Sequence, residues 1–206
     1  MAKYYGYVSV PHATYDQFRA AVLNNGYDVD YSYGCQCYDM ALLFWNNVGF
    51  PQGYPLSSGI GANGIWDRRN ENIAYNGTTY FSLIPNLADV KRGDVIIYSE
   101  FSGNPFGHIG FADQDYAPWH AANPGNYEFP ILSQNNGGTS DPAGGSYNNI
   151  HGYDTRLFRG AFRYIPWGGG PTPPTPGGGT WRPSKSKFPW VLVTRNLRNQ
   201  RGGNEF

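Results

Sequence analysis

The stretch Asp28–Val48, which reads DVDYSYGCQCYDMALLFWNNV, decides the fold. Its second half predicts a helix over Cys37–Asn47, because apolar side chains recur there at intervals of three and four residues. Gly49 and Pro51 follow at positions typical of the end of a helix. The predicted buried face of this helix consists of Cys37, Met40, Ala41, Phe44, Trp45 and Val48.

A second helix is predicted earlier in the chain, over Tyr15–Asn25. Thr14 precedes it, and Gln17 lies three positions further on, which is the pattern of a capping box. Gly26 then stands where a glycine commonly ends a helix.

Beyond Gly53 the sequence changes to short apolar pieces separated by turn residues. The 28 glycines and 16 prolines among 206 residues predict many turns, and they argue against a coiled coil or an all-helical bundle. Helices followed by strands predict an α+β fold, with the N-terminal helices packed on an antiparallel sheet. The strand candidates are Asp94–Tyr98, His108–Ala112, Phe129–Leu132, Leu157–Phe158 and Ala161–Ile165.

The sequence also predicts how the chain is divided. Gly168–Gly179 reads GGGPTPPTPGGG, which predicts a flexible and partly extended linker. It separates a domain over 1–167 from a tail over 180–206. The tail has a net charge of +5 and the rest of the chain −5. The apolar segment Phe188–Val193 predicts an anchoring peptide that becomes ordered on a partner, and a solvated tail is the alternative.

Composition excludes several classes of protein. Charged residues are 15% and aromatic residues 17% of the chain, so the low charge does not indicate disorder. The longest apolar run, Met40–Trp45, is too short to span a membrane, and no signal peptide is expected at the N-terminus. The basic tail lacks a nucleic-acid motif, so no nucleic-acid partner is expected. Cys35 and Cys37 are one residue apart, which excludes a disulfide framework and gives little support to structural zinc.

One cysteine and one histidine form the predicted reactive pair. Cys37 is the first residue of its helix, where unpaired N–H groups and about half a positive charge favour a thiolate. His108 begins a predicted strand directly after Gly107, and a catalytic thiol needs such a base from elsewhere in the fold. The alternatives are a cysteine buried in the core and a structural histidine.

Two further groups are predicted to assist this pair. We expect Asn135, or its neighbour Gln134, to orient the imidazole as an amide does in papain-like sites. We expect the side-chain amide of Gln36 and the N–H of Cys37 to bind a developing oxyanion. The alternatives are an asparagine that forms a turn and an exposed glutamine.

Three carboxylates surround the predicted nucleophile in the sequence. Asp28 and Asp30 lie on a loop, and Asp39 follows in the first turn of the helix. This set predicts a site for a hard cation, with loop carbonyls completing its coordination. Such an ion would fix the loop that orients Cys37. Aspartates that merely cap a turn are the alternative.

Five motifs occur in a fixed order: Tyr33–Asp39 (YGCQCYD), Arg92–Val95 (RGDV), Gly107–Gly110 (GHIG), Ser133–Asn135 (SQN) and Gly160–Tyr164 (GAFRY). As a set they resemble the CHAP domain, the cysteine, histidine-dependent amidohydrolase/peptidase family, over about residues 10–166. The resemblance implies a papain-like α+β fold and hydrolysis of amide bonds in bacterial peptidoglycan. It also implies that Cys37 is the nucleophile and His108 the base.

The resemblance implies calcium as well, because some members bind it through a D-x-D loop upstream of their Cys-x-Asp. Asp28, Asp30 and Asp39 match those positions. Ser32 matches a position that supplies a backbone carbonyl, and Gly34 stands where a side-chain ligand can occur.

One departure from the family concerns the group that orients the histidine. Many members have Glu-x-Asn where this chain has Ser133-Gln134-Asn135, so the acidic residue is absent while Asn135 is kept. Either Asn135 orients His108, or the thiol and the imidazole act as a dyad. We expect lower activity or a different helper group.

The predicted function is a cysteine-dependent peptidoglycan endopeptidase or N-acetylmuramoyl-L-alanine amidase of phage origin. It would be a virion-associated tail lysin, bound to phage tail proteins through 180–206, or an endolysin released from the host cytoplasm to the wall. The alternative is a structural tail component or wall-binding module with little or no hydrolytic activity. The aromatic residues predicted to line a substrate groove, or else to belong to the core, are Tyr31, Tyr33, Trp66 and Trp119.

Overall fold

The computed structural model describes residues 1–59 and 61–168. The predicted linker beyond Gly168 and the predicted tail over 180–206 lie outside the described residues. The structure that follows therefore lies within the predicted domain over 1–167, except for Gly168, the first residue of the predicted linker.

The centre of this domain is a six-stranded sheet in the order β5-β10-β6-β7-β8-β9, in which every neighbouring pair is antiparallel. This confirms the predicted antiparallel sheet. β10, the last of these strands in the chain, lies between β5 and β6, and among the described strands it is the only sheet neighbour of β5. The strands are β5 (Phe81–Ile84), β6 (Val95–Tyr98), β7 (His108–Ala112), β8 (Glu128–Ser133), β9 (Asn149–Asp154) and β10 (Phe158–Tyr164).

Two small sheets that the sequence did not predict flank the main one. One is a parallel pair, β1 with β2, and the other is an antiparallel hairpin, β3 with β4. The first pair matters for the site, because β2 ends at the first of the three predicted metal ligands. Their bounds are β1 (Lys3–Tyr5), β2 (Gly26–Asp28), β3 (Ala74–Tyr75) and β4 (Thr78–Thr79).

The helix over Cys37–Asn47, α2, has the predicted bounds. α1 begins as predicted, with the Thr14 hydroxyl accepting from the N–H of Gln17, but its predicted end at Asn25 is wrong. The chain leaves the helix at Leu23, because the following residues bond to other segments instead; the N–H of Gly26, for example, donates to Ala2. The remaining helical elements are α1 (Tyr15–Val22), α3 (Gly64–Asp67), α4 (Arg69–Asn72), α5 (Tyr116–Ala122), η1 (Leu87–Asp89), η2 (Thr155–Leu157) and η3 (Ile165–Gly168). Over 1–59 and 61–168, no helix combines the length and the apolar character that a membrane crossing requires.

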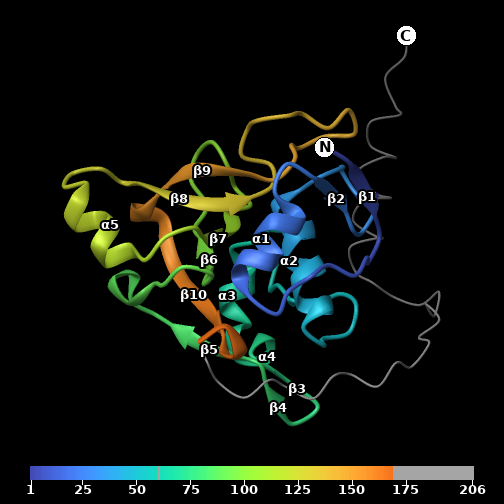
Figure 1. Ribbon diagram of the computed structural model, residues 1–206, viewed down its shortest axis with the longest axis horizontal. Helices are drawn as coiled ribbons and strands as arrows, with labels where there is room; N and C mark the ends of the chain where they lie inside the picture. Colours follow the sequence, from blue (N-terminus) through green and yellow to red (C-terminus); the bar gives the residue numbers. More distant parts are fainter. Residues whose placement is uncertain (60, 169–206) are drawn as a thin grey trace. The chain divides into compact units, whose positions relative to one another are not determined.

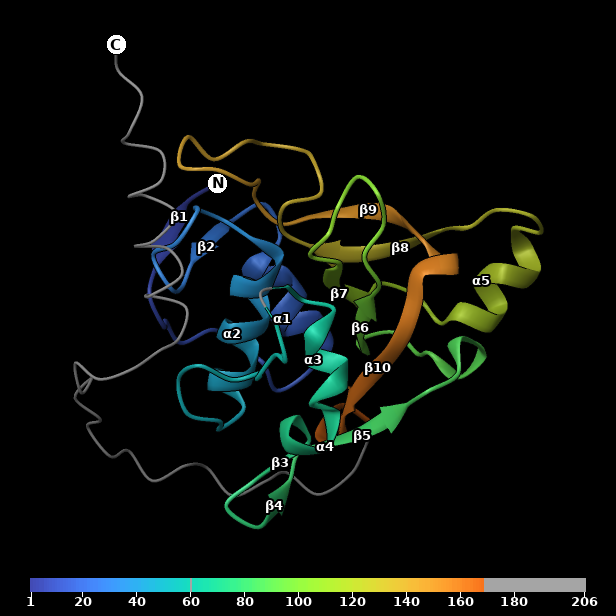
Figure 2. The ribbon, with the colours of Figure 1, turned by 180° about the vertical axis from the view of Figure 1, so that it is seen from behind.

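Both faces of the sheet are covered. α1 and α2 pack on one face, while α5 lies on the other side of the molecule (Figures 1 and 2). The sheet therefore has one apolar core on the face of α1 and α2, called the first core, and a second core on the opposite face. In β6, Val95 and Ile97 belong to the first core, whereas Ile96 and Tyr98 belong to the second. Successive residues of a strand point to opposite faces, so a strand covered on both sides is apolar throughout. This explains the run VIIY.

Phe44 of α2 is the centre of the first core. Its side chain is fully buried, and its ring centroid lies 5.0 Å from that of Phe18 in α1 and 5.0 Å from that of Phe111 in β7. These aromatic contacts hold both helices against the strand that begins with His108. The packing of Phe44 therefore sets the distance between α2 and β7.

Replacing Phe44 by alanine should lower the free energy of unfolding by about 3–5 kcal/mol, because the cavity adds to the loss of buried apolar area. Urea unfolding followed by circular dichroism measures this change. Phe101→Ala is the matched control, since Phe101 is 46% exposed and should lose far less stability. Equal losses in the two variants would contradict the placement of Phe44 at the centre of the core.

Candidate active site

The first turn of α2 meets the beginning of β7. Cys37 is the first residue of α2, and its sulfur accepts a hydrogen bond from the backbone N–H of Ile109, the residue after His108. Gly107 precedes the strand with φ +66°, a conformation that favours glycine, and a Cβ there would lie 2.4 Å from the carbonyl oxygen of Tyr98. The structure thus brings the predicted nucleophile and the predicted base to neighbouring positions.

The imidazole of His108 is buried and held on two sides. Its Nε2 lies 2.9 Å from Oγ of Ser133. Its ring stacks on Tyr153 of β9, with a centroid distance of 4.5 Å and an interplanar angle of 8°. These contacts fix both the position and the plane of the ring.

Burial keeps both members of the pair neutral. It raises the pKa of Cys37 to about 11, although the N–H groups of Ile109 and of the first turn of α2 oppose this change. It lowers the pKa of His108 to about 3, and the nearby His151 adds to this effect. The sequence predicted a thiolate at the helix N-terminus. The structure shows instead that the loss of solvation outweighs the helix N–H groups, so the resting pair is a thiol and a neutral imidazole.

Asn135 is not placed against the imidazole. The strand β8 ends at Ser133, and Asn135 has φ +59°, which turns the chain away from β7. Its amide nitrogen donates to Oε1 of Gln36 at 2.6 Å. The residue that reaches His108 from this segment is Ser133.

Gln36 stands at the N-cap of α2, directly before Cys37. Its side chain is held at both ends, because Oε1 accepts from Asn135 and Nε2 donates to the carbonyl of Tyr33 at 2.7 Å. The predicted oxyanion donor is therefore a fixed amide beside the thiol, and one of its two N–H groups is already used within the loop.

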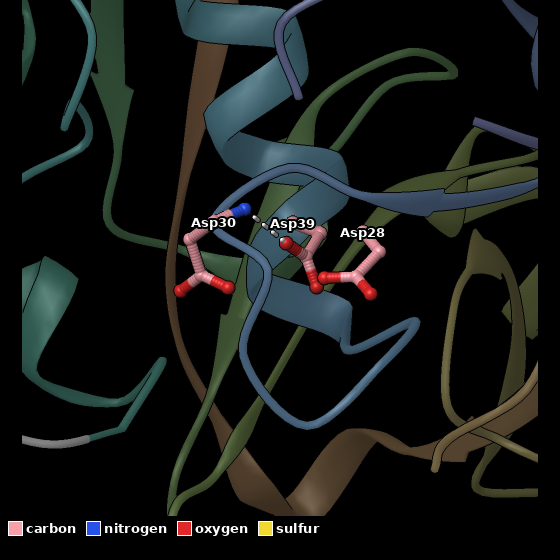
Figure 3. Close-up of side chains that lie close together, drawn as sticks. All are labelled: Asp28, Asp30 and Asp39. Carbon is pink, nitrogen blue, oxygen red and sulfur yellow. Dashed lines mark hydrogen bonds between the residues drawn. The ribbon is translucent and has the colours of Figure 1, made fainter. Parts of the chain in front are cut away.

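The three predicted carboxylates lie together, with one oxygen of each within 4.8 Å of the others (Figure 3). Asp28 and Asp39 are buried and Asp30 is exposed. Oδ1 of Asp39 accepts from the N–H groups of Val29 and Asp30, at 2.7 and 3.2 Å. Desolvation raises the pKa of Asp39 well above its usual range, and the charge on Asp30 raises it further.

This cluster fits a hard cation. Oδ1 of Asp28 is buried and has no hydrogen-bond partner within the part of the chain that the structure covers. Carboxylate oxygens are the ligands that calcium prefers. Lys3 balances part of the charge from one side, since its Nζ lies 3.3 Å from Asp28 and 2.6 Å from Asp141. Ser32 is on the same loop and donates its N–H to Asp30 at 2.8 Å.

The four aromatic residues named from the sequence separate into two groups. Tyr31 and Tyr33 are exposed on the loop before α2, at 71% and 60%. Trp66 packs on Phe162 of the first core. Trp119 is a residue of α5, and its side chain belongs to the second core. For the two tryptophans the core interpretation is confirmed.

Tyr153 and Asn136 are contacts of the site that the sequence did not indicate. Tyr153 stacks on His108, and Nδ2 of Asn136 donates to Oγ of Ser133 at 2.6 Å. Neither residue carries a local signal, because each contact depends on how distant strands are paired. From the sequence, Ser133 stands out only as the position that lacks the family's acid.

Comparisons with known proteins agree with the fold. No protein-family model matches the chain. A relative from Streptococcus phage B30, named D-alanyl-L-alanine endopeptidase, is 31% identical over 152 residues, which are 73% of this chain and 30% of the relative. The chain thus spans less than a third of the length of that relative. The crystal structure of the wild-type endolysin LysIME-EF1 matches with a TM-score of 0.50 and 17% identity, over 93% of this chain and 87% of that chain. At this identity the likeness shows a shared mixed α/β fold.

The imidazole of His108 should remain neutral as the pH falls from 8 to about 5, because burial lowers its pKa to about 3. The Cε1 proton shift of His108, assigned by NMR with a His108→Gln variant, measures its titration. A midpoint near the ordinary value of about 6.5 would show that the ring is solvated and would contradict the neutral pair.

Proposed function

We propose that this domain is a CHAP-type peptidoglycan hydrolase with a papain-like arrangement, in which Cys37 and His108 cleave an amide bond of the bacterial cell wall. The observation that carries the proposal is the contact of the Cys37 sulfur with the N–H next to His108, together with the buried and oriented imidazole. The similarity to a phage D-alanyl-L-alanine endopeptidase supports the substrate class. It also favours an endopeptidase over an N-acetylmuramoyl-L-alanine amidase.

The mechanism starts from the neutral pair. His108 takes the thiol proton as the sulfur of Cys37 attacks the peptide carbonyl, which is general-base catalysis. The N–H of Cys37 and the free N–H of the Gln36 amide stabilise the oxyanion. The imidazolium then gives its proton to the leaving amine, and a thioester remains. His108 next takes a proton from water, whose oxygen attacks the thioester and releases the acid and the thiol.

Calcium is the proposed cofactor, and Asp28, Asp30, Asp39 and the carbonyl of Ser32 are its proposed ligands. When bound, it supplies positive charge that holds the loop between β2 and α2. Asp39 also accepts the N–H of Gln36 at 2.9 Å, so the acidic cluster is connected directly to the residue before Cys37. The cluster thereby positions the first turn of α2.

The biological setting is proposed to be a bacteriophage. The protein would act as an endolysin that passes from the host cytoplasm to the wall, or as a lysin carried in the virion tail. In the second case residues 180–206 would bind a phage tail protein. Recovery of the chain with purified intact virions would support the tail location, and its absence from them the endolysin.

One observation favours a second candidate, a structural tail component or wall-binding module. The histidine partner is the hydroxyl of Ser133, not a carboxylate, so no negative charge supports an imidazolium at this position. A site of this kind is weaker as a catalyst. Activity measurements on cell walls separate the two candidates.

Cys37→Ala should reduce the turbidity loss of Gram-positive cell walls by at least about 1000-fold, because the covalent route is removed. Cys35→Ala is the matched control, since Cys35 is the second free cysteine of the described chain, is buried, and lies outside the proposed machinery. Mass spectrometry of the released fragments identifies the new termini and hence the bond. Equal activity of Cys37→Ala and wild type would refute the nucleophile. Inactive wild-type protein that still binds walls would favour the binding module.

Asp30→Ala should lower wall hydrolysis by about tenfold at limiting calcium, and excess calcium should restore part of it, because one carboxylate ligand is lost. Calorimetric titration with calcium measures the binding directly. Asp89→Ala removes an exposed carboxylate elsewhere and should bind calcium as wild type does. Identical activity in chelator and in calcium, with no heat of binding, would rule out the metal.

A further inference from the structure

We propose that Ser133, held by Asn136, positions the imidazole of His108, so that this chain replaces the missing acid with a neutral relay of a hydroxyl and an amide. The inference rests on the proposed function, since it assigns how the base of that site is oriented. Neither residue touches the substrate in this scheme, and both act through the imidazole.

The relay is a chain of two short contacts. Nε2 of His108 lies 2.9 Å from Oγ of Ser133, and Nδ2 of Asn136 lies 2.6 Å from the same oxygen. Ser133 is fully buried and His108 is 2% exposed. Water therefore does not compete for the hydroxyl, and the amide of Asn136 holds it toward the ring.

Strand pairing explains why Ser133 takes this role. In the ladder between β7 and β8, Phe111 pairs with Leu132, which places Ser133 beside Gly110. Residues at positions i and i+2 of a strand share one face. Ser133 is thus a diagonal neighbour of His108 on the same face, within reach of a long side chain.

Gly110 provides the space for this contact. A Cβ on Gly110 would lie 2.9 Å from Cβ of Ser133 and 2.8 Å from Cδ1 of Ile131. Real Cβ atoms do not approach this closely, so any other residue would push β8 away from β7. The glycine two residues after the histidine therefore allows Ser133 to approach the ring.

The relay has a chemical consequence. Asn136 donates one N–H to Oγ of Ser133, and this oxygen keeps a second lone pair that can accept a proton carried by Nε2 of His108. With Nε2 protonated, Nδ1 is unprotonated and available for the thiol proton of Cys37. His108 makes no other side-chain hydrogen bond within 1–59 and 61–168, which leaves Nδ1 for that purpose. The relay orients the base without adding a charge.

The test measures alkylation of Cys37 by iodoacetamide across a range of pH, quantified by peptide mass spectrometry so that Cys35 is counted separately. Ser133→Ala should lower the rate at pH 7 by about tenfold, because the base is no longer held. The difference should shrink toward pH 10, where the thiol ionises without help. Ser146→Ala is the matched control, since it removes another buried hydroxyl that bonds to Gly137 instead.

Three further variants separate positioning from packing. Ser133→Thr keeps the hydroxyl and should restore most of the rate. Asn136→Ala removes the amide donor and should lower the rate by about threefold, in proportion to one lost hydrogen bond. Ser133→Asp should raise the rate at pH 6 above that of wild type, because a carboxylate stabilises the imidazolium and so favours the thiolate. Thermal unfolding of each variant confirms that it is folded.

The outcomes distinguish this inference from the proposed function. If His108→Ala leaves alkylation unchanged, the thiol–imidazole pair itself fails, and the proposed function fails with it. If His108→Ala slows alkylation while folded Ser133→Ala and Ser146→Ala both match wild type, only the relay is overturned. The relay is also overturned if Ser133→Asp and Ser133→Ala slow alkylation equally at pH 6, because packing alone would then account for the effect.

Discussion

The contact between the first turn of α2 and the first residues of β7 is the constraint on which the site depends. Cys37 is placed by the apolar stripe of its helix, and its sulfur is fixed by the N–H of Ile109. His108 is placed by the pairing of β7 with its neighbours on both sides. Phe44 and Phe111 join the same two elements in the core. Packing far from the surface thus sets where the reactive groups lie.

Burial has opposite consequences on the two sides of Cys37. On the side of β7 it removes charge, because a desolvated thiol and a desolvated imidazole are most stable as neutral groups. On the side of the loop it concentrates charge, because Asp28 and Asp39 are buried beside each other. The negative charge of Asp39 also raises the pKa of the Cys37 thiol. Whatever neutralises the acidic cluster therefore also favours ionisation of the thiol.

The sequence was sufficient where the determinants are local. The spacing of apolar residues gave α2 its bounds, and the glycine before His108 marked the start of β7. It was insufficient where distant segments meet. Asn135 matches the asparagine of the family motif, yet its left-handed backbone turns its side chain toward Gln36. Ser133 contacts His108 instead. The register between strands and the left-handed backbone at Asn135 depend on how distant segments assemble, and no short sequence motif encodes them.

The position of β10 has a consequence for biosynthesis. Among the strands over 1–59 and 61–168, β5 pairs with β10 alone, and β10 ends at Tyr164, near the end of the domain. Until that segment has left the ribosome, β5 has no partner and one edge of β6 is open, and open edges attract other strands. Contacts between residues so far apart in the chain also form slowly. A nascent or truncated chain that stops before Phe158 therefore lacks β10, the strand that joins β5 to the rest of the sheet. If such a chain were released, its open strand edges would favour aggregation of the protein.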